Sequence, residues 1–500
     1  MPTASASAVP TASPTPPPLQ VQPLSAQVAV GATQQVTVGG AIGDITAVAR
    51  NAATVGVTID QESRTLTLAG EAPGATFVDI ADSRGVSYAL GVRVAYIAGT
   101  IAPYVSIQLT GDPASADYVR KRVMAAVIQA AQLRPNAQVV LSRSDVAIPG
   151  DLSQDDTVDL DVPVLIQGDA YFDANGTTHV HVANIAAPRI SPRSLMVSDY
   201  PERLTENGVL FTSVLQHDAP SRFLYFHYNP PGQPDRRIVL RASNHSAEPA
   251  IVQFIAGLGG PSPNEMEAGH DATKRFLVHV VQNEGRLITV GAHQSFNILA
   301  QNLPAGQILS ELLQLRVLSG GNIHLALFAQ NASDDPNAPL AQTDLLTSTV
   351  RHARGIYDIP EFHYATQWDL TGPYLTLPIG QIPLPNTLKG EALAGDYGVL
   401  EAFVVNVQNP LPTPQSIAIY ENPRGGHATG TYIIDGVLVQ SHQVPPFSRY
   451  KVRQYVVPSK GFVRITIVTM PEGGSSYPLD LIFAPDDGSV APGAPGSPIY

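Results

Sequence analysis

Residues 222–260 read RFLYFHYNPPGQPDRRIVLRASNHSAEPAIVQFIAGLGG, and this stretch decides the fold class. Within it, the runs Arg236–Leu240 and Ile251–Ile255 flank a polar turn at Asn244–Pro249. Short β-branched and aromatic runs bounded by Asn, Pro and Gly are typical of strands joined by tight turns. The stretch therefore predicts extended β-structure, with the rest of the chain as modules before and after it.

The composition supports the same interpretation for the whole chain. Its 500 residues are too many for one hydrophobic core, so several domains are expected. Glycine (41) and proline (44) are abundant, and only 14% of the residues are charged. We therefore expect a mostly β, multi-domain string of Ig-like β-sandwiches, with one small α/β module that contains a single clear helix.

The charge and the missing residue types exclude several classes of partner and chemistry. A net charge of −13 disfavours nucleic acid and anionic membrane surfaces, because both would repel the chain. The absence of cysteine excludes disulfides, thiolate metal sites and cysteine nucleophiles. No apolar run has the length of a transmembrane segment, and residues 1–18 lack the pattern of a leader peptide.

The N-terminal region divides into a spacer and a small domain. Residues 1–23 are rich in Ala, Ser, Thr and Pro and carry no charged side chain, which predicts a disordered linker. From residue 24 to 98, apolar and polar residues alternate in QVAVGATQQVTV, TVGVTI, RTLTLAG and TFVDIAD, with glycines between the runs. Alternation with a turn every few residues predicts an antiparallel Ig-like sandwich.

The same segments carry a family resemblance. The order VAVGATQQVTVGG, ITAVARNAATVGVTID, TLTLAGEAPGATFVDIADSRG and YALGVRV, within residues 24–94, resembles the pilus-formation N-terminal domain of Tad-type pilus secretins and related bacterial envelope proteins. The resemblance implies a bacterial envelope or extracellular protein and a packing module. It does not extend to a secretin barrel, because no later region has that pattern.

Residues 99–190 are expected to form the α/β module. Apolar residues at three- and four-residue spacing predict a helix over residues 117–133, with Asp112 or Ser115 as its cap. The acidic run 151–161 is interpreted as a solvated loop, with calcium binding as the alternative. On a strand, His179 and His181 would point to one face, as a metal-binding pair does, but the sequence offers no obvious third ligand.

The C-terminal half is interpreted as a degenerate duplication. A sandwich over residues 221–345 and another over 390–485 are expected, with linkers at 191–220 and 346–389 and a flexible tail at 486–500. The proposed equivalences pair 238–242 with 400–407, 251–255 with 416–420, 295–306 with 448–461, and 323–328 with 463–468. Pieces such as RFLYFHYN, MEAGHDATKRF, GDYGV, NPRGG and MPEGGSSYP resemble uncharacterised β-rich regions (195–485 here) of secreted bacterial surface proteins, a resemblance that implies no activity.

Two groups of residues are candidates for a site. The first is a potential divalent-cation site, or a carboxylate paired with a histidine base, at Glu265, Glu267, His270 and Asp271. Its alternative is a loop that runs into a short helical turn. The second is a potential rim for a sugar or peptide, made by Asp396, Tyr397, Arg424, Tyr432 and Tyr477. Its alternative is a set of tight sandwich turns, and the lone Trp368 is expected to be packed.

No zincin, nucleophile-elbow, P-loop or dinucleotide motif is present in the sequence. We therefore expect a non-catalytic, exported bacterial surface or envelope protein that acts in adhesion, surface structure or pilus-like assembly. Its expected partners are other copies of itself, envelope proteins or glycan, and no cofactor is expected beyond a divalent cation such as calcium. The alternatives are a secreted carbohydrate-active enzyme that uses residues 265–271, and a carbohydrate-binding protein that uses the C-terminal Tyr/Gly loops.

Overall fold

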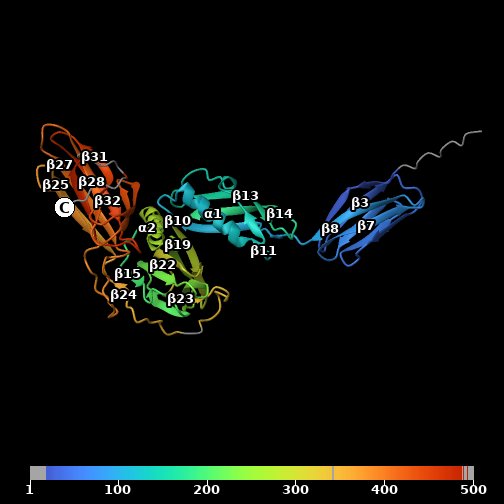
Figure 1. Ribbon diagram of the computed structural model, residues 1–500, viewed down its shortest axis with the longest axis horizontal. Helices are drawn as coiled ribbons and strands as arrows, with labels where there is room; N and C mark the ends of the chain where they lie inside the picture. The colour runs from blue at the N-terminus through green and yellow to red at the C-terminus, as the bar shows by residue number, and fades with distance from the viewer. Residues whose placement is uncertain (1–17, 341–342, 487, 489–492, 494–500) are drawn as a thin grey trace, which may run out of the picture. The chain divides into compact units, whose positions relative to one another are not determined.

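The computed structural model describes residues 18–340, 343–486, 488 and 493. Strands dominate this part of the chain, which contains two α-helices and one short 3-10 helix (Figure 1). The predicted fold class, mostly β with several sandwiches, is therefore confirmed. Most of the predicted spacer 1–23 and of the predicted tail 486–500 lies outside the described residues. The described end of the spacer is not a disordered linker, because Gln20–Gln22 forms a strand and Val21 is buried in the core of the first sandwich. Among the residues that are described, no helix combines the length and apolarity needed to cross a membrane.

Two compact units make up the chain. Unit 1 comprises residues 1–107, 119–149 and 158–182, and unit 2 comprises residues 108–118, 150–157 and 183–500.

An Ig-like sandwich forms the first part of unit 1. Its two four-stranded sheets have the orders β1-β3-β6-β5 and β2-β8-β7-β4. The strands are β1 (Gln20–Gln22), β2 (Ser25–Ala29), β3 (Thr33–Gly39), β4 (Ile45–Ala49), β5 (Val55–Asp60), β6 (Thr65–Gly70), β7 (Gly74–Asp82) and β8 (Ser87–Ala95). Alternate residues point inward, so Leu66, Leu68, Val78 and Ile80 are fully buried. The alternation in the sequence is thus the pattern of the core.

Short strands and the first helix follow. The elements are β9 (Gly99–Thr100), β10 (Tyr104–Thr110), α1 (Ala116–Ala130), β11 (Gln132–Leu133), β12 (Gln138–Val140), the 3-10 helix η1 (Arg143–Asp145), β13 (Thr157–Gln167) and β14 (Ala174–Asn184). The Ser115 hydroxyl accepts a hydrogen bond from the Tyr118 amide at 3.3 Å, as an N-cap does. Val119, Val123 and Val127 form the buried stripe. The helix ends before the predicted Leu133, because Gln132–Leu133 pairs with β9.

Unit 2 contains two further sandwiches. Sandwich A (residues 194–331) consists of β15 (Ser194–Ser198), β16 (Gly208–Leu215), β17 (Ser221–Asn229), β18 (Arg236–Asn244), β19 (Ala250–Ser262), β20 (Gly285–Val290), β21 (Ser295–Leu303), β22 (Gln307–Ser319) and β23 (Ile323–Asn331). Sandwich B (residues 361–485) consists of β25 (Glu361–Asp369), β26 (Leu375–Ile379), β27 (Leu400–Asn409), β28 (Gln415–Pro423), β29 (Ala428–Ile434), β30 (Val437–Val444), β31 (Tyr450–Val457), β32 (Gly461–Thr469) and β33 (Leu479–Pro485). A separate strand, β24 (Arg354–Tyr357), extends sandwich A at β15.

Sandwiches A and B share one topology. In sandwich A the strands follow the orders β20-β19-β22-β17-β15 and β16-β23-β18-β21, and in sandwich B they follow β30-β29-β32-β27-β25 and β26-β33-β28-β31. Each strand of A therefore corresponds to the strand of B whose label is ten higher. Even the parallel pairing is repeated, since β15 runs parallel to β17 and β25 runs parallel to β27.

This topology corrects parts of the sequence interpretation. The predicted linker 191–220 contains β15 and β16, and the predicted connector 346–389 contains β24 and β26, so neither stretch is a linker. The predicted pairing of 295–306 with 448–461 matches β21 with β31. The other three predicted pairings are each displaced by one strand. For example, residues 238–242 lie in β18, whose equivalent strand in sandwich B is β28, whereas the predicted partner 400–407 lies in β27.

One helix distinguishes the two copies. In sandwich B a two-residue turn joins β29 to β30, whereas in sandwich A the helix α2 (Glu265–Val281) separates β19 from β20. A Cβ on Gly257 or Gly259 would lie 2.1 or 2.0 Å from a carbonyl oxygen of α2, so glycine permits the helix to lie on β19. The sequence pattern around residues 265–276 had been interpreted as a loop that runs into a short helical turn, and the structure has a full helix there.

The two sandwiches also share an interface with its own apolar cluster, which includes Leu224, Phe276, Val399 and Met470. On the helix, Gly269 lies so close to sandwich B that an added Cβ would stand 1.6 Å from the carbonyl oxygen of Gly473. Helix α2 is therefore packed against both sandwiches.

Candidate ligand-binding cleft

A cleft of 540 Å³ lies where sandwich A, sandwich B and the beginning of α2 meet. Six of the side chains that line it are acidic or basic. They are Asp199, Glu202, Glu265, Arg351, His352 and Glu391. Apolar walls come from Val197, Leu224 and Phe226 of sandwich A, and Tyr397 and residues 473–476 close the side that belongs to sandwich B. A concave site with a few converging polar groups is the usual form of a ligand site.

The register of two edge strands builds the polar end of the cleft. Because β24 runs antiparallel to β15, with Ser198 opposite Arg354, the residue after β15 meets the residues before β24. The Asp199 amide donates to the Ala353 carbonyl at 2.9 Å, which places the Asp199 carboxylate beside His352. Glu202 follows in the same loop.

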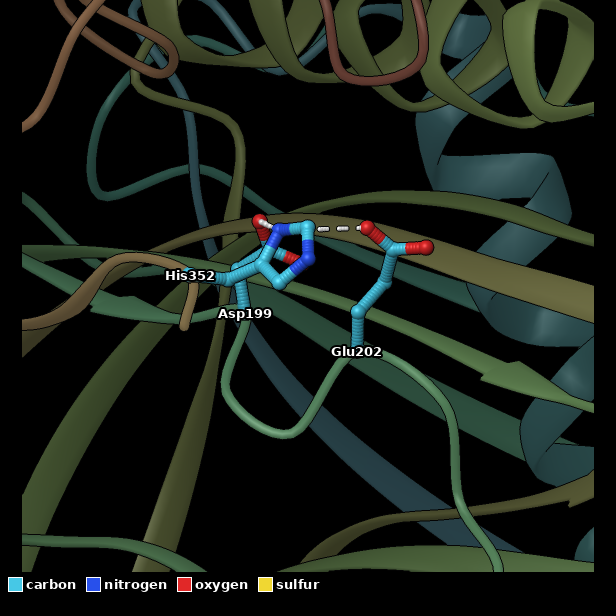
Figure 2. A group of neighbouring side chains, drawn as sticks. All are labelled: Asp199, Glu202 and His352. Atoms are coloured by element: carbon cyan, nitrogen blue, oxygen red, sulfur yellow. Dashed lines mark ion pairs between the residues drawn. The ribbon is translucent and has the colours of Figure 1, made fainter. Parts of the chain in front are cut away.

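These three side chains converge on one point. Nδ1 of His352 lies 3.5 Å from Oδ2 of Asp199 and 3.2 Å from Oε2 of Glu202. Figure 2 shows the imidazole between the two carboxylates. One ligand atom from each residue lies within 4.8 Å of the others, so the group has the geometry to share one cation. The Oδ1 atom of Asp199 is buried without a hydrogen-bond partner.

The environment shifts the protonation of this group. Burial raises the pKa of Asp199 to about 6, and the nearby charge of Glu202 adds to the rise while His352 opposes it. The Asp199 carboxylate in turn raises the pKa of His352 above its ordinary value. Shifted pKa values of this kind, with a specific charged partner in a cleft, are common at functional sites.

A glycine-containing loop forms the opposite wall. Gly474 has φ of +75°, and an added Cβ would lie 2.4 Å from the carbonyl oxygen of Glu265, so the loop touches the beginning of α2. The Tyr397 hydroxyl donates to the Ser475 carbonyl at 2.8 Å. These contacts fix the loop against both sandwiches.

A buried polar network lies behind this loop. The Ser475 and Thr429 hydroxyls are 2.6 Å apart, and Thr429 also bonds the Glu472 carboxylate. Glu472 Oε2 lies 2.9 Å from His270 Nδ1. Burial alone would lower the pKa of His270, but the hydrogen bond and charge of Glu472 raise it. The network therefore holds an ion pair between α2 and sandwich B.

The four residues predicted to form a cation site do not meet. Glu265 lines the cleft, but Glu267 accepts a hydrogen bond from Ser262 at 2.8 Å and His270 is buried against Glu472. Asp271 pairs with Arg275 at 2.8 Å on the exposed face of α2. Their helical spacing distributes them around α2, which the interpretation as a loop did not anticipate.

The five residues predicted to form a rim do not make one surface, although the Tyr397 and Tyr477 rings meet edge to face with their centroids 5.9 Å apart. Tyr397 lines the cleft, and Arg424 pairs with Asp480 at 2.8 Å. Tyr432 and Tyr477 are packed in the core of sandwich B, as is Trp368. Asp396 is buried beside a different cavity.

Within unit 1, the pair His179 and His181 has acidic neighbours. His179 lies 3.1 Å from Asp161, and His181 lies 2.8 Å from Asp159, across the β13–β14 pair. In unit 2, Asp151 instead accepts a hydrogen bond from the Ala116 amide at the start of α1. The acidic run is thus divided between ion pairs and turn or cap contacts.

Sequence reasoning missed Asp199, Glu202 and His352. The available signal was the Asp-x-x-Glu spacing in SDYPER, which lies in a stretch interpreted as a linker. His352 lies far along the chain, and only the pairing of β24 with β15 brings it to the other two.

No protein-family model matches the chain, and no curated protein matches it either. Among solved structures, a tri-modular endo-β-1,4-glucanase from Bacillus licheniformis is similar at 10% identity and a TM-score of 0.14, over 33% of this chain. This chain spans 38% of the length of that enzyme. SGBP-B of the Bacteroides ovatus mixed-linkage glucan utilization locus, in complex with a heptasaccharide, is similar at 10% identity and a TM-score of 0.13, over 61% of this chain and 71% of that one. At such low TM-scores, these similarities do not indicate a function for this chain.

Proposed function

We propose that this chain is an exported β-module protein that binds a ligand in the cleft between sandwiches A and B, through a divalent metal ion held by Asp199, Glu202 and His352. The observation that carries the proposal is the convergence of three ligand atoms within 4.8 Å in that cleft. The resemblance of residues 24–94 to an envelope-protein domain supports export and a role in adhesion or surface structure, with glycan or other envelope proteins as partners.

The donor set indicates which metal would fit. Two carboxylates and one imidazole suit Zn²⁺ or Mn²⁺ better than Ca²⁺, which prefers six or more oxygen ligands. The buried, unpartnered Oδ1 of Asp199 also fits a site that gains a partner when a cation binds. A bound metal would leave coordination positions open toward the cleft, where glycan hydroxyls or a peptide carboxylate could bind.

The test is a metal titration of the purified, EDTA-stripped chain by isothermal titration calorimetry. We expect Zn²⁺ or Mn²⁺ to bind with one ion per chain, and Asp199→Asn, Glu202→Gln and His352→Ala each to weaken binding at least about tenfold. Glu265→Gln and Glu391→Gln are matched controls, since both carboxylates line the cleft outside the group. Equal affinities in all five variants would refute the metal site.

Export is tested separately by fractionation of the native host with an antibody to this chain. Signal in the envelope or the culture medium is expected. A signal confined to the cytoplasm would refute the exported part of the proposal and leave the metal site standing. A glycan array with metal-loaded protein then tests the ligand class.

A second candidate function is a secreted carbohydrate hydrolase. The observation that favours it is the raised pKa of Asp199, about 6, beside the carboxylate of Glu202. Paired carboxyl groups in different environments are the acid and base of glycosidases. A panel of glycans incubated with the wild type, Asp199→Asn and Glu202→Gln distinguishes this function from binding alone, because only an enzyme releases reducing ends.

A further inference from the structure

A second cavity, of 450 Å³, opens in sandwich B and shares no lining residue with the cleft. It lies beside the parallel strands β25 and β27, and the segment 377–382 forms its other side. Two kinds of side chain define it, a set of aromatic rings and a pair of carboxyl groups. No lysine, arginine or histidine is among its lining residues, all of which are described.

The aromatic rings lie on one face of the sheet. Phe362 and Tyr364 are two residues apart on β25, and Tyr364 is the register partner of Phe403 on β27. The Tyr364 and Phe403 rings are stacked with their centroids 5.1 Å apart, and Phe362 stacks on Tyr364 at 5.9 Å. The cavity therefore has a wall of three stacked aromatic rings.

The carboxyl groups come from Asp396 and Glu401, which are 1% and 2% exposed. Glu401 accepts a hydrogen bond from the Gly380 amide at 3.0 Å, and Asp396 accepts one from the Ile382 amide at 3.0 Å. The other oxygen of Asp396, Oδ1, is buried without any hydrogen-bond partner. A buried carboxyl oxygen with no partner is costly, and a ligand that pairs with it would recover that cost.

We infer that this cavity is a binding site for a small organic ammonium ion, with the charge of the ligand held by Asp396 and Glu401 and its alkyl groups held against Phe362, Tyr364 and Phe403. Cations are attracted to aromatic faces, and most strongly where water is excluded. The two carboxyl groups have no basic residue beside them in the cavity lining, so their negative charge is available to a cationic ligand. The inference does not depend on the metal site in the cleft.

The titration of the two acids supports the same ligand. Burial raises the pKa of Glu401 to about 8 and that of Asp396 to about 6. The titratable groups that face them are each other and Tyr364. Between about pH 6 and pH 8, Glu401 thus holds a proton that a bound cation would displace, so the affinity for a cation should rise with pH.

The experiment compares choline with its uncharged isostere 3,3-dimethylbutan-1-ol by isothermal titration calorimetry on the full chain. Choline is expected to bind at least about tenfold more tightly than the isostere at about pH 8.5. Its affinity should fall at least about tenfold at about pH 6, where Glu401 is protonated in the empty site. Asp396→Asn and Glu401→Gln keep the side-chain shape and should each remove most of the preference for choline.

Glu391→Gln, in the separate cleft but outside the proposed metal site, is the matched control and should bind choline as the wild type does. Equal binding of choline and the isostere would overturn the inference, as would no binding of either at millimolar concentration. So would choline binding that is unchanged in both pocket variants. The two wild-type comparisons, of ligands and of pH, decide the question even where a variant fails to fold by circular dichroism.

Discussion

The side-chain amides of Asn229 and Asn409 make matching hydrogen bonds at the ends of two equivalent strands, β17 and β27. Asn229 Nδ2 donates to the Leu303 carbonyl at 3.0 Å, and Asn409 Nδ2 donates to the Val457 carbonyl at 3.2 Å. Leu303 ends β21 and Val457 ends β31, which are themselves equivalent strands. Each asparagine thus joins the two sheets of its sandwich at the same corner.

Asn409→Ala should lower the free energy of unfolding by about 2 kcal/mol or more, because it leaves buried carbonyls without a donor. Asn409 is 1% exposed, and its amide also bonds the carbonyls of Thr413 and Pro458. Urea denaturation measures the loss. Gln408→Ala, at the exposed neighbouring position, is the control and should change stability by less than about 0.5 kcal/mol. An equally small loss of stability in Asn409→Ala would show that the hydrogen bonds of Asn409 between the two sheets do not stabilise the sandwich.

The asparagine corners also show how far the sequence predicts the fold. Alternation predicted strands correctly where one face is buried, as at Leu66 and Leu68, since inward and outward residues differ there. The duplication of the sandwich in the C-terminal half was also predicted, from similar turn residues at the ends of its strands. However, Asn244 and Asn409 both precede a turn, and a local pattern could not tell that Asn229 is the counterpart of Asn409.

The site was less predictable for a physical reason. Helix α2 was interpreted as a loop although Ala268, Ala272 and Phe276 recur at four-residue spacing, because polar and small residues such as Gly269 and His270 interrupt this apolar stripe. Asp199 and His352 meet only through the β15–β24 register, a long-range pairing that no local spacing encodes.

Gly269→Ala should destabilise the interface between the sandwiches. The added Cβ would stand 1.6 Å from the Gly473 carbonyl oxygen, so either α2 or the loop must move. We expect a loss of about 2–4 kcal/mol, within or slightly above the usual cost of overpacking. Gly150→Ala is the control, because nothing lies within 4 Å of a Cβ at that position. Thermal unfolding followed by circular dichroism measures both, and equal melting temperatures would show that the loop yields freely.

The buried Glu421 should make stability depend on pH. Burial raises its pKa from 4.5 to about 7, although its side chain accepts a hydrogen bond from Ser441. Between these values the folded chain holds a proton that the unfolded chain has released, so the contribution of Glu421 to stability falls as pH rises. The fall amounts to about 3 kcal/mol over this range.

Glu421→Gln keeps an oxygen for Ser441 and removes the titration. Urea denaturation at about pH 4.5, 6 and 7 should therefore show a shallower decline for Glu421→Gln than for the wild type. Parallel declines in the two proteins would mean that Glu421 titrates normally.

The ion pair between Arg222 and Glu361 should contribute more to stability than any exposed pair. Arg222 is fully buried on β17, and its guanidinium lies 2.8 Å from the Glu361 carboxylate at the start of β25, so the pair joins the two sandwiches. Glu361→Ala would leave a buried cation without its partner, at a cost of about 3–5 kcal/mol. Glu391→Ala is the matched control, since its pair with Arg351 is largely exposed and should contribute less than about 1 kcal/mol. Urea denaturation of both variants measures the two losses of stability. Losses of equal size would show that the carbonyl oxygens of Pro360 and Gly398, which also accept hydrogen bonds from Arg222, are enough to stabilise its charge.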